Sequence, residues 1–184
     1  MVRPISFKGF QKGFQGVSLR GFRGFQILLW ELCVCIKYLS LGDPAAGSGN
    51  FLTETYLCLR RLENEVISLQ LGGQIMLGEA INPIKVSISQ FYGIEINDFA
   101  VTVAKTALWI AESQMMKETE DIVHMSLDFL PLKTNATIIE GNALRLDWNK
   151  VVPRAELSYI MGIIWSSDQS IQDVHDEAHN LLAA

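Results

Sequence analysis

The stretch Asp43-Pro44-Ala45-Ala46-Gly47-Ser48-Gly49-Asn50-Phe51 is a turn of small residues, and it decides the fold. The apolar, β-prone run Leu32–Ile36 precedes it and predicts a buried strand ending near Gly42. Apolar residues at helical spacing follow it and predict an amphipathic helix. A glycine turn between a strand and a helix is typical of a ligand site at the edge of a parallel α/β sheet.

Three more strands are predicted further along the chain. They cover Gln90–Ile94, Ala136–Glu140 and Leu157–Met161. Asn97 or Asp98 can cap a helix that runs to about Met116. Strands and helices that alternate in this order predict a parallel sheet with right-handed crossovers.

The pattern also predicts which face of each helix is buried. The first helix is expected to bury its apolar residues and to expose Arg60, Arg61, Glu63, Asn64 and Glu65. Its expected buried face consists of Leu52, Tyr56, Leu59, Leu62, Val66 and Leu69. The expected apolar face of the second helix consists of Phe99, Val103, Ala107 and Ile110.

Composition indicates a protein of the cytoplasm. The 184 residues carry a net charge of −5, and 49% of them are hydrophobic, which is ordinary for a folded α/β domain. Three cysteines do not form a secreted disulfide framework. The apolar stretch 27–41 contains Glu31 and Lys37, so we predict no membrane span. The acidic balance also argues against a protein that grips DNA over its whole surface.

Three segments are predicted. Residues 1–30 form a low-complexity leader of Gly, Phe and basic residues, best interpreted as disordered. The alternative is a basic arm that contacts phosphates or stacks its rings on single-stranded bases. Residues 31–165 form the partial ligand-binding domain, and residues 166–184 form a polar tail.

The residues of the turn narrow the choice of ligand. A phosphate-binding loop needs a lysine after Gly47, and a dinucleotide turn needs a third glycine where Leu52 stands. An acid directly before the turn suits a ligand that bears an ammonium group, as S-adenosylmethionine does. At the next strand end, the Glu95 carboxylate can accept hydrogen bonds from both ribose hydroxyls, and Ile96 offers an apolar face to adenine. Asn142 can hydrogen-bond the adenine edge.

Three motifs in this order resemble the adenine-specific (N6) DNA methyltransferases of restriction–modification and phage-defence systems. They are the turn 43–51, Gly93-Ile94-Glu95-Ile96-Asn97 and Glu140-Gly141-Asn142-Ala143-Leu144, within a similarity over roughly residues 41–162. The resemblance implies a class I methyltransferase Rossmann-like parallel sheet, truncated after about the fourth strand, with S-adenosylmethionine as cofactor and DNA as partner. It implies that Asp43, Ala45, Gly47 and Gly49 surround the methionine moiety. The full expected cofactor-binding set is Asp43, Ala45, Gly47, Gly49, Phe51, Glu95, Ile96, Asn142 and Ala143.

The catalytic tetrapeptide of that family does not follow the fourth predicted strand. The family has Asn/Asp-Pro-Pro-Tyr/Phe there, whose polar atoms hold the target amino group and whose ring stacks on the flipped base. Here Ile163-Ile164-Trp165-Ser166 follows Gly162, so we assign no catalytic residue. We therefore expect an incomplete fragment without measurable methyl transfer. Two alternatives stay open: a non-catalytic cofactor-binding remnant or subunit that needs a partner chain, and a methyltransferase acting on RNA or protein.

One further pattern resembles a metal site. His175 and His179 are four residues apart, which is metal-ligand spacing on a helix. However, Asp176 stands where the zinc-protease pattern has Glu, and no third ligand is evident. We predict a polar helix face and no bound metal.

Overall fold

The computed structural model describes residues 32, 35–71, 83–127, 135–153 and 156–161. Its centre is a four-stranded parallel sheet with the order β3-β2-β1-β4. Leu41 of β1 is paired with Phe91 of β2, and Glu95 of β2 is paired with Glu140 of β3. This confirms the predicted α/β class with a parallel sheet. The strands are β1 (Leu41–Asp43), β2 (Phe91–Glu95), β3 (Thr137–Glu140) and β4 (Tyr159–Ile160).

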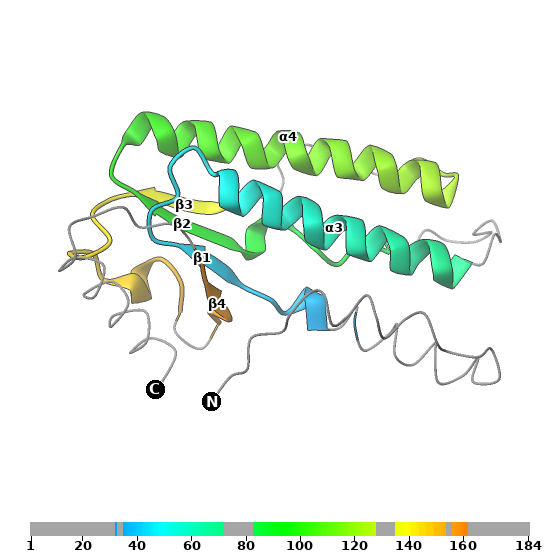
Figure 1. Ribbon diagram of the computed structural model, residues 1–184, viewed down its shortest axis with the longest axis horizontal. Helices are drawn as coiled ribbons and strands as arrows, with labels where there is room; N and C mark the ends of the chain where they lie inside the picture. Colours follow the sequence, from blue (N-terminus) through cyan, green and yellow to red (C-terminus); the bar gives the residue numbers. More distant parts are fainter. Residues whose placement is uncertain (1–31, 33–34, 72–82, 128–134, 154–155, 162–184) are drawn as a thin grey trace.

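Two long helices cover one face of the sheet side by side (Figure 1). They are α3 (Asn50–Leu71) and α4 (Asp98–Val123), and Asn97 caps α4 as predicted. The short 3-10 helix η3 (Ile88–Gln90) leads into β2, and η4 (Trp148–Lys150) lies on the opposite face. The main core fills the space between the two helices and the sheet, and its fully buried members include Leu52, Tyr56, Ile88, Phe91, Leu108 and Ile138.

The strand predicted at Leu32–Ile36 is wrong. Residue 32 and residues 35–37 are helical, and the first strand begins at Leu41. The physical reason is the spacing of the apolar side chains: Leu32 and Ile36 are four residues apart and both pack against the main core. That spacing places two side chains on one face of a helix. Strand β1 is only three residues long and does not include the predicted stretch.

The predicted helix faces also need correction. In α4 the buried residues include Val101, Ala104 and Leu108, whereas Phe99 is 72% exposed and Ile110 is 54% exposed. The helix also continues past Met116 to Val123. In α3, Leu69 is 50% exposed, and the polar residues Arg60, Glu63 and Asn64 are buried. Arg61 and Glu65 are exposed, as expected.

What we call the buried polar layer consists of Arg60, Glu63 and Asn64 of α3 and Thr119 of α4. Arg60 makes an ion pair with Glu63, and Arg60 Nη2 donates to Thr119 Oγ1 at 2.6 Å. Asn64 Oδ1 lies 2.7 Å from the same hydroxyl. Glu63 Oε1 accepts the backbone N–H of Val86 at 3.2 Å. The ion pair and these hydrogen bonds join α3 to α4 and to the segment before β2. Among the described residues, Arg60 Nε and Asn64 Nδ2 are buried without a hydrogen-bond partner.

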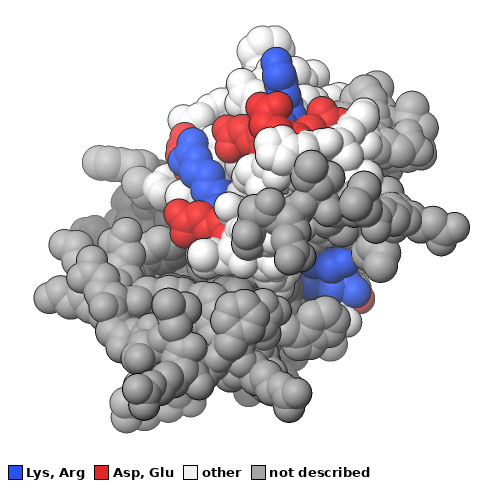
Figure 2. Space-filling view, turned by 90° about the vertical axis from the view of Figure 1, so that its right-hand side faces the viewer, with Lys and Arg blue, Asp and Glu red and all other residues white. Residues whose placement is uncertain are grey.

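No helix in the described part of the chain is both long and apolar enough to cross a membrane. Figure 2 shows the side of the molecule where α3 and α4 end, and on it the described basic and acidic side chains are interspersed. That face therefore lacks a patch of one sign among its described residues. The leader 1–30 and the tail 166–184 lie outside the described residues.

Candidate functional site at the carboxyl edge of the sheet

The turn between β1 and α3 is built around two glycines in left-handed conformations. We call residues 43–50 the glycine turn; within it φ is +54° at Gly47 and +82° at Gly49. The Ala46 N–H donates to Ile94 O at 3.0 Å, which attaches the turn to β2. A Cβ at Gly49 would lie 2.9 Å from Ala104 Cβ of α4, closer than packed carbons approach. Gly49 is therefore required by its conformation and by this contact with α4.

Glu95 connects the glycine turn to the neighbouring strand and helix. Its Oε2 accepts the Gly47 N–H at 2.8 Å, and its Oε1 accepts the Asn97 N–H at 3.0 Å. Its backbone oxygen accepts the Gly141 N–H at 2.9 Å. The ends of β1, β2 and β3 therefore meet at one edge of the sheet, and Asn142 follows directly after Gly141. Gly47, Glu95 and Asn142 are brought to the same edge, as a shared site requires.

Asp43 is a buried carboxylate at the end of β1. It is 2% exposed, and its Oδ1 accepts the Ala45 N–H at 2.9 Å. Burial raises its pKa to about 6; the Ala45 hydrogen bond opposes this rise and the nearby Glu95 carboxylate adds to it. Within the described residues, no lysine or arginine pairs with it. A buried negative charge without a counterion is suited to a cationic ligand.

The remaining predicted residues line the same edge in different ways. Ile96 is 70% exposed and Phe51, in the first turn of α3, is 45% exposed, so both present apolar surface. Asn142 Oδ1 accepts the Leu144 N–H at 2.9 Å, so its free hydrogen-bonding atom is the amide nitrogen. Ala143 is half-buried and packs with the core on the η4 face. Asn142 can therefore serve a ligand as a donor.

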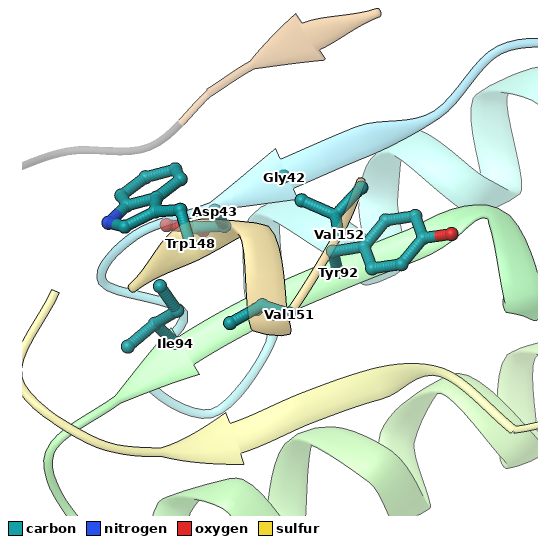
Figure 3. A pocket seen from close by; sticks show the side chains of 8 residues that line it. Gly42, Asp43, Tyr92, Ile94, Trp148, Val151 and Val152 are labelled. Carbon is teal, nitrogen blue, oxygen red and sulfur yellow. The ribbon is translucent and has the colours of Figure 1, made fainter. Parts of the chain in front are cut away.

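Trp148 is a residue that the sequence reasoning missed. It is buried, its Nε1 donates to Ala143 O at 2.8 Å, and in Figure 3 it lies beside Asp43. The only sequence signal for its position is Asp147, whose side chain caps η4 by accepting the Asn149 N–H. Trp148 therefore bounds the site on the face of the sheet where η4 lies. It lines a small cavity with Gly42, Asp43, Tyr92, Gly93, Ile94, Val151 and Val152.

Two predicted features lie outside the described residues. They are the stretch Ile163–Ser166, where the family has its catalytic tetrapeptide, and the pair His175 and His179. Within the described part of the chain, no group of three or more His, Cys, Asp or Glu side chains could hold a metal ion.

Fold and site together define a parallel α/β domain with a glycine turn at the carboxyl edge of its sheet, the class that includes methyltransferases. The chain matches the sequence family described as MmeI, DNA-methyltransferase domain, over residues 22–177. The matched range extends on both sides of residues 41–162, the stretch that contains the three motifs. The chain belongs to this family of DNA-methyltransferase domains.

Two known proteins place the chain in context. It is 48% identical over 137 residues to DNA methyltransferase A of Bacillus subtilis (strain 168), which covers 73% of this chain and 15% of that protein. It also resembles the solved structure of the Type IIL restriction-modification enzyme MmeI in complex with DNA. There the TM-score is 0.68 and the identity 36%, over 74% of this chain and 18% of the MmeI chain. The chain thus spans less than a fifth of either relative.

Proposed function

We propose that this chain is the S-adenosylmethionine-binding part of a DNA methyltransferase of the restriction–modification type, acting on adenine N6 in the cytoplasm. The single observation that carries the proposal is the buried Asp43 carboxylate, which has no counterion among the described residues, beside a glycine turn that Glu95 contacts. A small cationic ligand with a ribose uses both features, since one carboxylate offsets its charge and the other accepts hydroxyl hydrogens. An anionic dinucleotide would place its pyrophosphate at the turn, where the buried Asp43 carboxylate would repel it.

The residues present fit the cofactor, which supplies the methyl group when bound. Asp43 would offset the positive charge of its methionine end, and Gly47 and Gly49 would let that end approach the backbone. α3 begins at Asn50, so the positive end of its dipole faces the turn and suits the cofactor carboxylate. Glu95 would bind the ribose hydroxyls. Ile96 would pack on the adenine ring, and Asn142 would donate to its edge.

The DNA substrate is supported by the relatives. MmeI was solved in complex with DNA, and the Bacillus subtilis relative is named a DNA methyltransferase. Adenine N6 as the acceptor rests on the resemblance of the three motifs. Because Ile163-Ile164-Trp165 offers no side-chain acceptor for the target amino group, we expect this chain alone to transfer no methyl group to DNA.

The same three residues favour a second candidate, a non-catalytic cofactor-binding subunit. A partner chain with the Asn/Asp-Pro-Pro-Tyr/Phe tetrapeptide would then complete the site. Co-purification of such a chain from native extracts, identified by its tetrapeptide and by methylation of adenine in DNA, would favour this candidate over an inactive remnant.

Photo-crosslinking with methyl-tritiated S-adenosylmethionine tests the proposal. We expect label on the chain, competed by unlabelled S-adenosylhomocysteine, and we expect Asp43→Asn to reduce it. In a filter assay with the same cofactor, DNA, RNA and a protein extract should all remain unlabelled. Labelled adenine in DNA would refute the expected inactivity, label on RNA or protein would refute the DNA assignment, and an unlabelled chain would refute cofactor binding.

A further inference from the structure

The Glu95 carboxylate accepts hydrogen bonds from two backbone groups of the protein. Its two oxygens accept one N–H each, from Gly47 of the glycine turn and from Asn97 at the start of α4. The Gly47 bond is long-range, since 48 residues separate donor and acceptor. Glu95 therefore joins the turn after β1 to the helix after β2, in addition to facing the ligand.

The glycine turn has few other attachments at this point. The Ala46 N–H is bonded to Ile94 O, and the Gly49 N–H is bonded within the turn to Ala46 O. Gly47 lies between them, and a Cβ added to it would have only Ala45 O within 4 Å, at 4.0 Å. The hydrogen bond to Glu95 is therefore the interaction that fixes the direction of the Gly47 N–H, and open space lies where a side chain would stand.

We propose that Glu95 is a positioning residue that holds the glycine turn in its ligand-ready conformation, in addition to any contact it makes with ribose. The ligand then meets a turn that is already formed and shares a carboxylate that is already hydrogen-bonded. This inference deepens the proposed function and rests on it for the identity of the ligand. Preorganisation of this kind raises affinity because the turn need not be ordered on binding.

The chemistry of the carboxylate makes Glu95→Gln a sharp test. Two N–H donors face two carboxylate oxygens, whereas an amide offers one oxygen and one NH2 group. The variant must therefore leave either Gly47 or Asn97 without an acceptor while it keeps almost the same size and shape. Glu140→Gln is the matched control, because Glu140 also ends a strand, pairs in register with Glu95 and is exposed.

Amide hydrogen exchange of the full, ligand-free chain is the first measurement. In Glu95→Gln we expect exchange at Gly47, Asn97 or both to become at least about tenfold faster, as expected for loss of a charge-assisted hydrogen bond. The Gly141 amide is an internal control, because it donates to the backbone oxygen of Glu95, which the variant retains. Unchanged exchange at Gly47 and Asn97 would overturn the proposal, as would a uniform increase that includes Gly141.

Calorimetric titration with two ligands is the second measurement. S-adenosylhomocysteine has the amino-acid end, and 5′-methylthioadenosine lacks it but keeps ribose and adenine. If Glu95 acts only on ribose, Glu95→Gln weakens both ligands by the same factor. If it also holds the turn against the amino-acid end, S-adenosylhomocysteine loses at least about threefold more affinity than 5′-methylthioadenosine, while Glu140→Gln changes neither.

The two measurements separate this inference from the proposed function. If the wild-type chain binds neither ligand but the exchange pattern is as expected, the proposed function fails and Glu95 still holds the turn. If both ligands bind and lose affinity equally in Glu95→Gln, the proposed function stands and the positioning role is overturned.

Discussion

The buried polar layer and the glycine turn each contain a buried carboxylate, and the two carboxylates differ in their interaction partners. Burial raises the pKa of both Glu63 and Asp43. Glu63 has Arg60 as a counterion and also accepts backbone N–H groups from Lys85 and Val86. Asp43 has one backbone N–H and, among the described residues, no counterion.

This difference distinguishes an acid that holds the fold from an acid that is available to a ligand. The carboxylate of Glu63 is satisfied inside the protein, so it has no capacity left for a ligand. The cost of burying Asp43 is offset only in part by the hydrogen bond from Ala45, and no counterion in the described chain adds to it. Uncompensated burial of this kind is typical of functional sites.

The largest effect on stability is expected when Glu63, the carboxylate with a counterion, is replaced. Glu63→Gln removes the carboxylate that forms an ion pair with the buried Arg60, which should lower the free energy of unfolding by about 3–5 kcal/mol. Urea denaturation followed by circular dichroism measures this. Glu65→Gln on the exposed side of the same helix is the control and should stay within about 0.5 kcal/mol of wild type. Equal effects of the two variants would show that the polar layer does not hold the fold.

A smaller loss is expected at the second glycine of the turn. Gly49→Ala combines a φ of +82° with a Cβ 2.9 Å from Ala104 Cβ, so it should lower the free energy of unfolding by roughly 2–4 kcal/mol. Gly47→Ala has a φ of +54° and open space, so its cost should be about 1 kcal/mol. Thermal unfolding of both variants tests this order. A greater loss for Gly47→Ala would contradict the packing of the turn on α4.

Substitution of Asp43 should have the opposite effect and raise the free energy of unfolding. The folded-state pKa of Asp43, about 6, is above its ordinary value of 3.8, so stability falls as the pH rises through that window and the cost is fully present above it. Asp43→Asn removes the charge and keeps an acceptor for Ala45. We expect the variant to be more stable than wild type by about 3 kcal/mol at pH 7.5.

The pH dependence of this variant supplies the control. The stability difference between Asp43→Asn and wild type should shrink toward zero below pH 4, where Asp43 is protonated in both folded and unfolded chains. Denaturation curves from pH 3.5 to 8 measure it. A variant less stable than wild type at pH 7.5 would mean that Asp43 has a partner that stabilises its charge.

The strand ends could be predicted from sequence because small and polar residues mark them. Strands β2 and β3 were predicted within one residue of their bounds, and the glycine turn was located correctly before α3. The helix faces could not be predicted in this way. Burial of Arg60 and Glu63 depends on Thr119 and on the N–H groups near residue 85, which are distant in sequence.

The site was predictable to the extent that its residues lie at strand ends. Asp43, Gly47 and Glu95 carry recognisable motifs, and the structure brings them to one edge of the sheet. The occupation of Glu95 by Gly47 and Asn97, and the wall formed by Trp148, depend on the three-dimensional path of the backbone. Apart from the Asp147 cap of η4, no local pattern indicates either of them.

Calorimetric titration of the full chain with S-adenosylhomocysteine tests the central claim most directly. Because Asp43 has no counterion among the described residues and lies beside the glycine turn, we predict saturable binding of one molecule per chain. Asp43→Asn should weaken that binding at least about tenfold while Glu140→Gln leaves it unchanged. Absence of heat from a folded wild-type chain, or equal affinities for all three proteins, would contradict it.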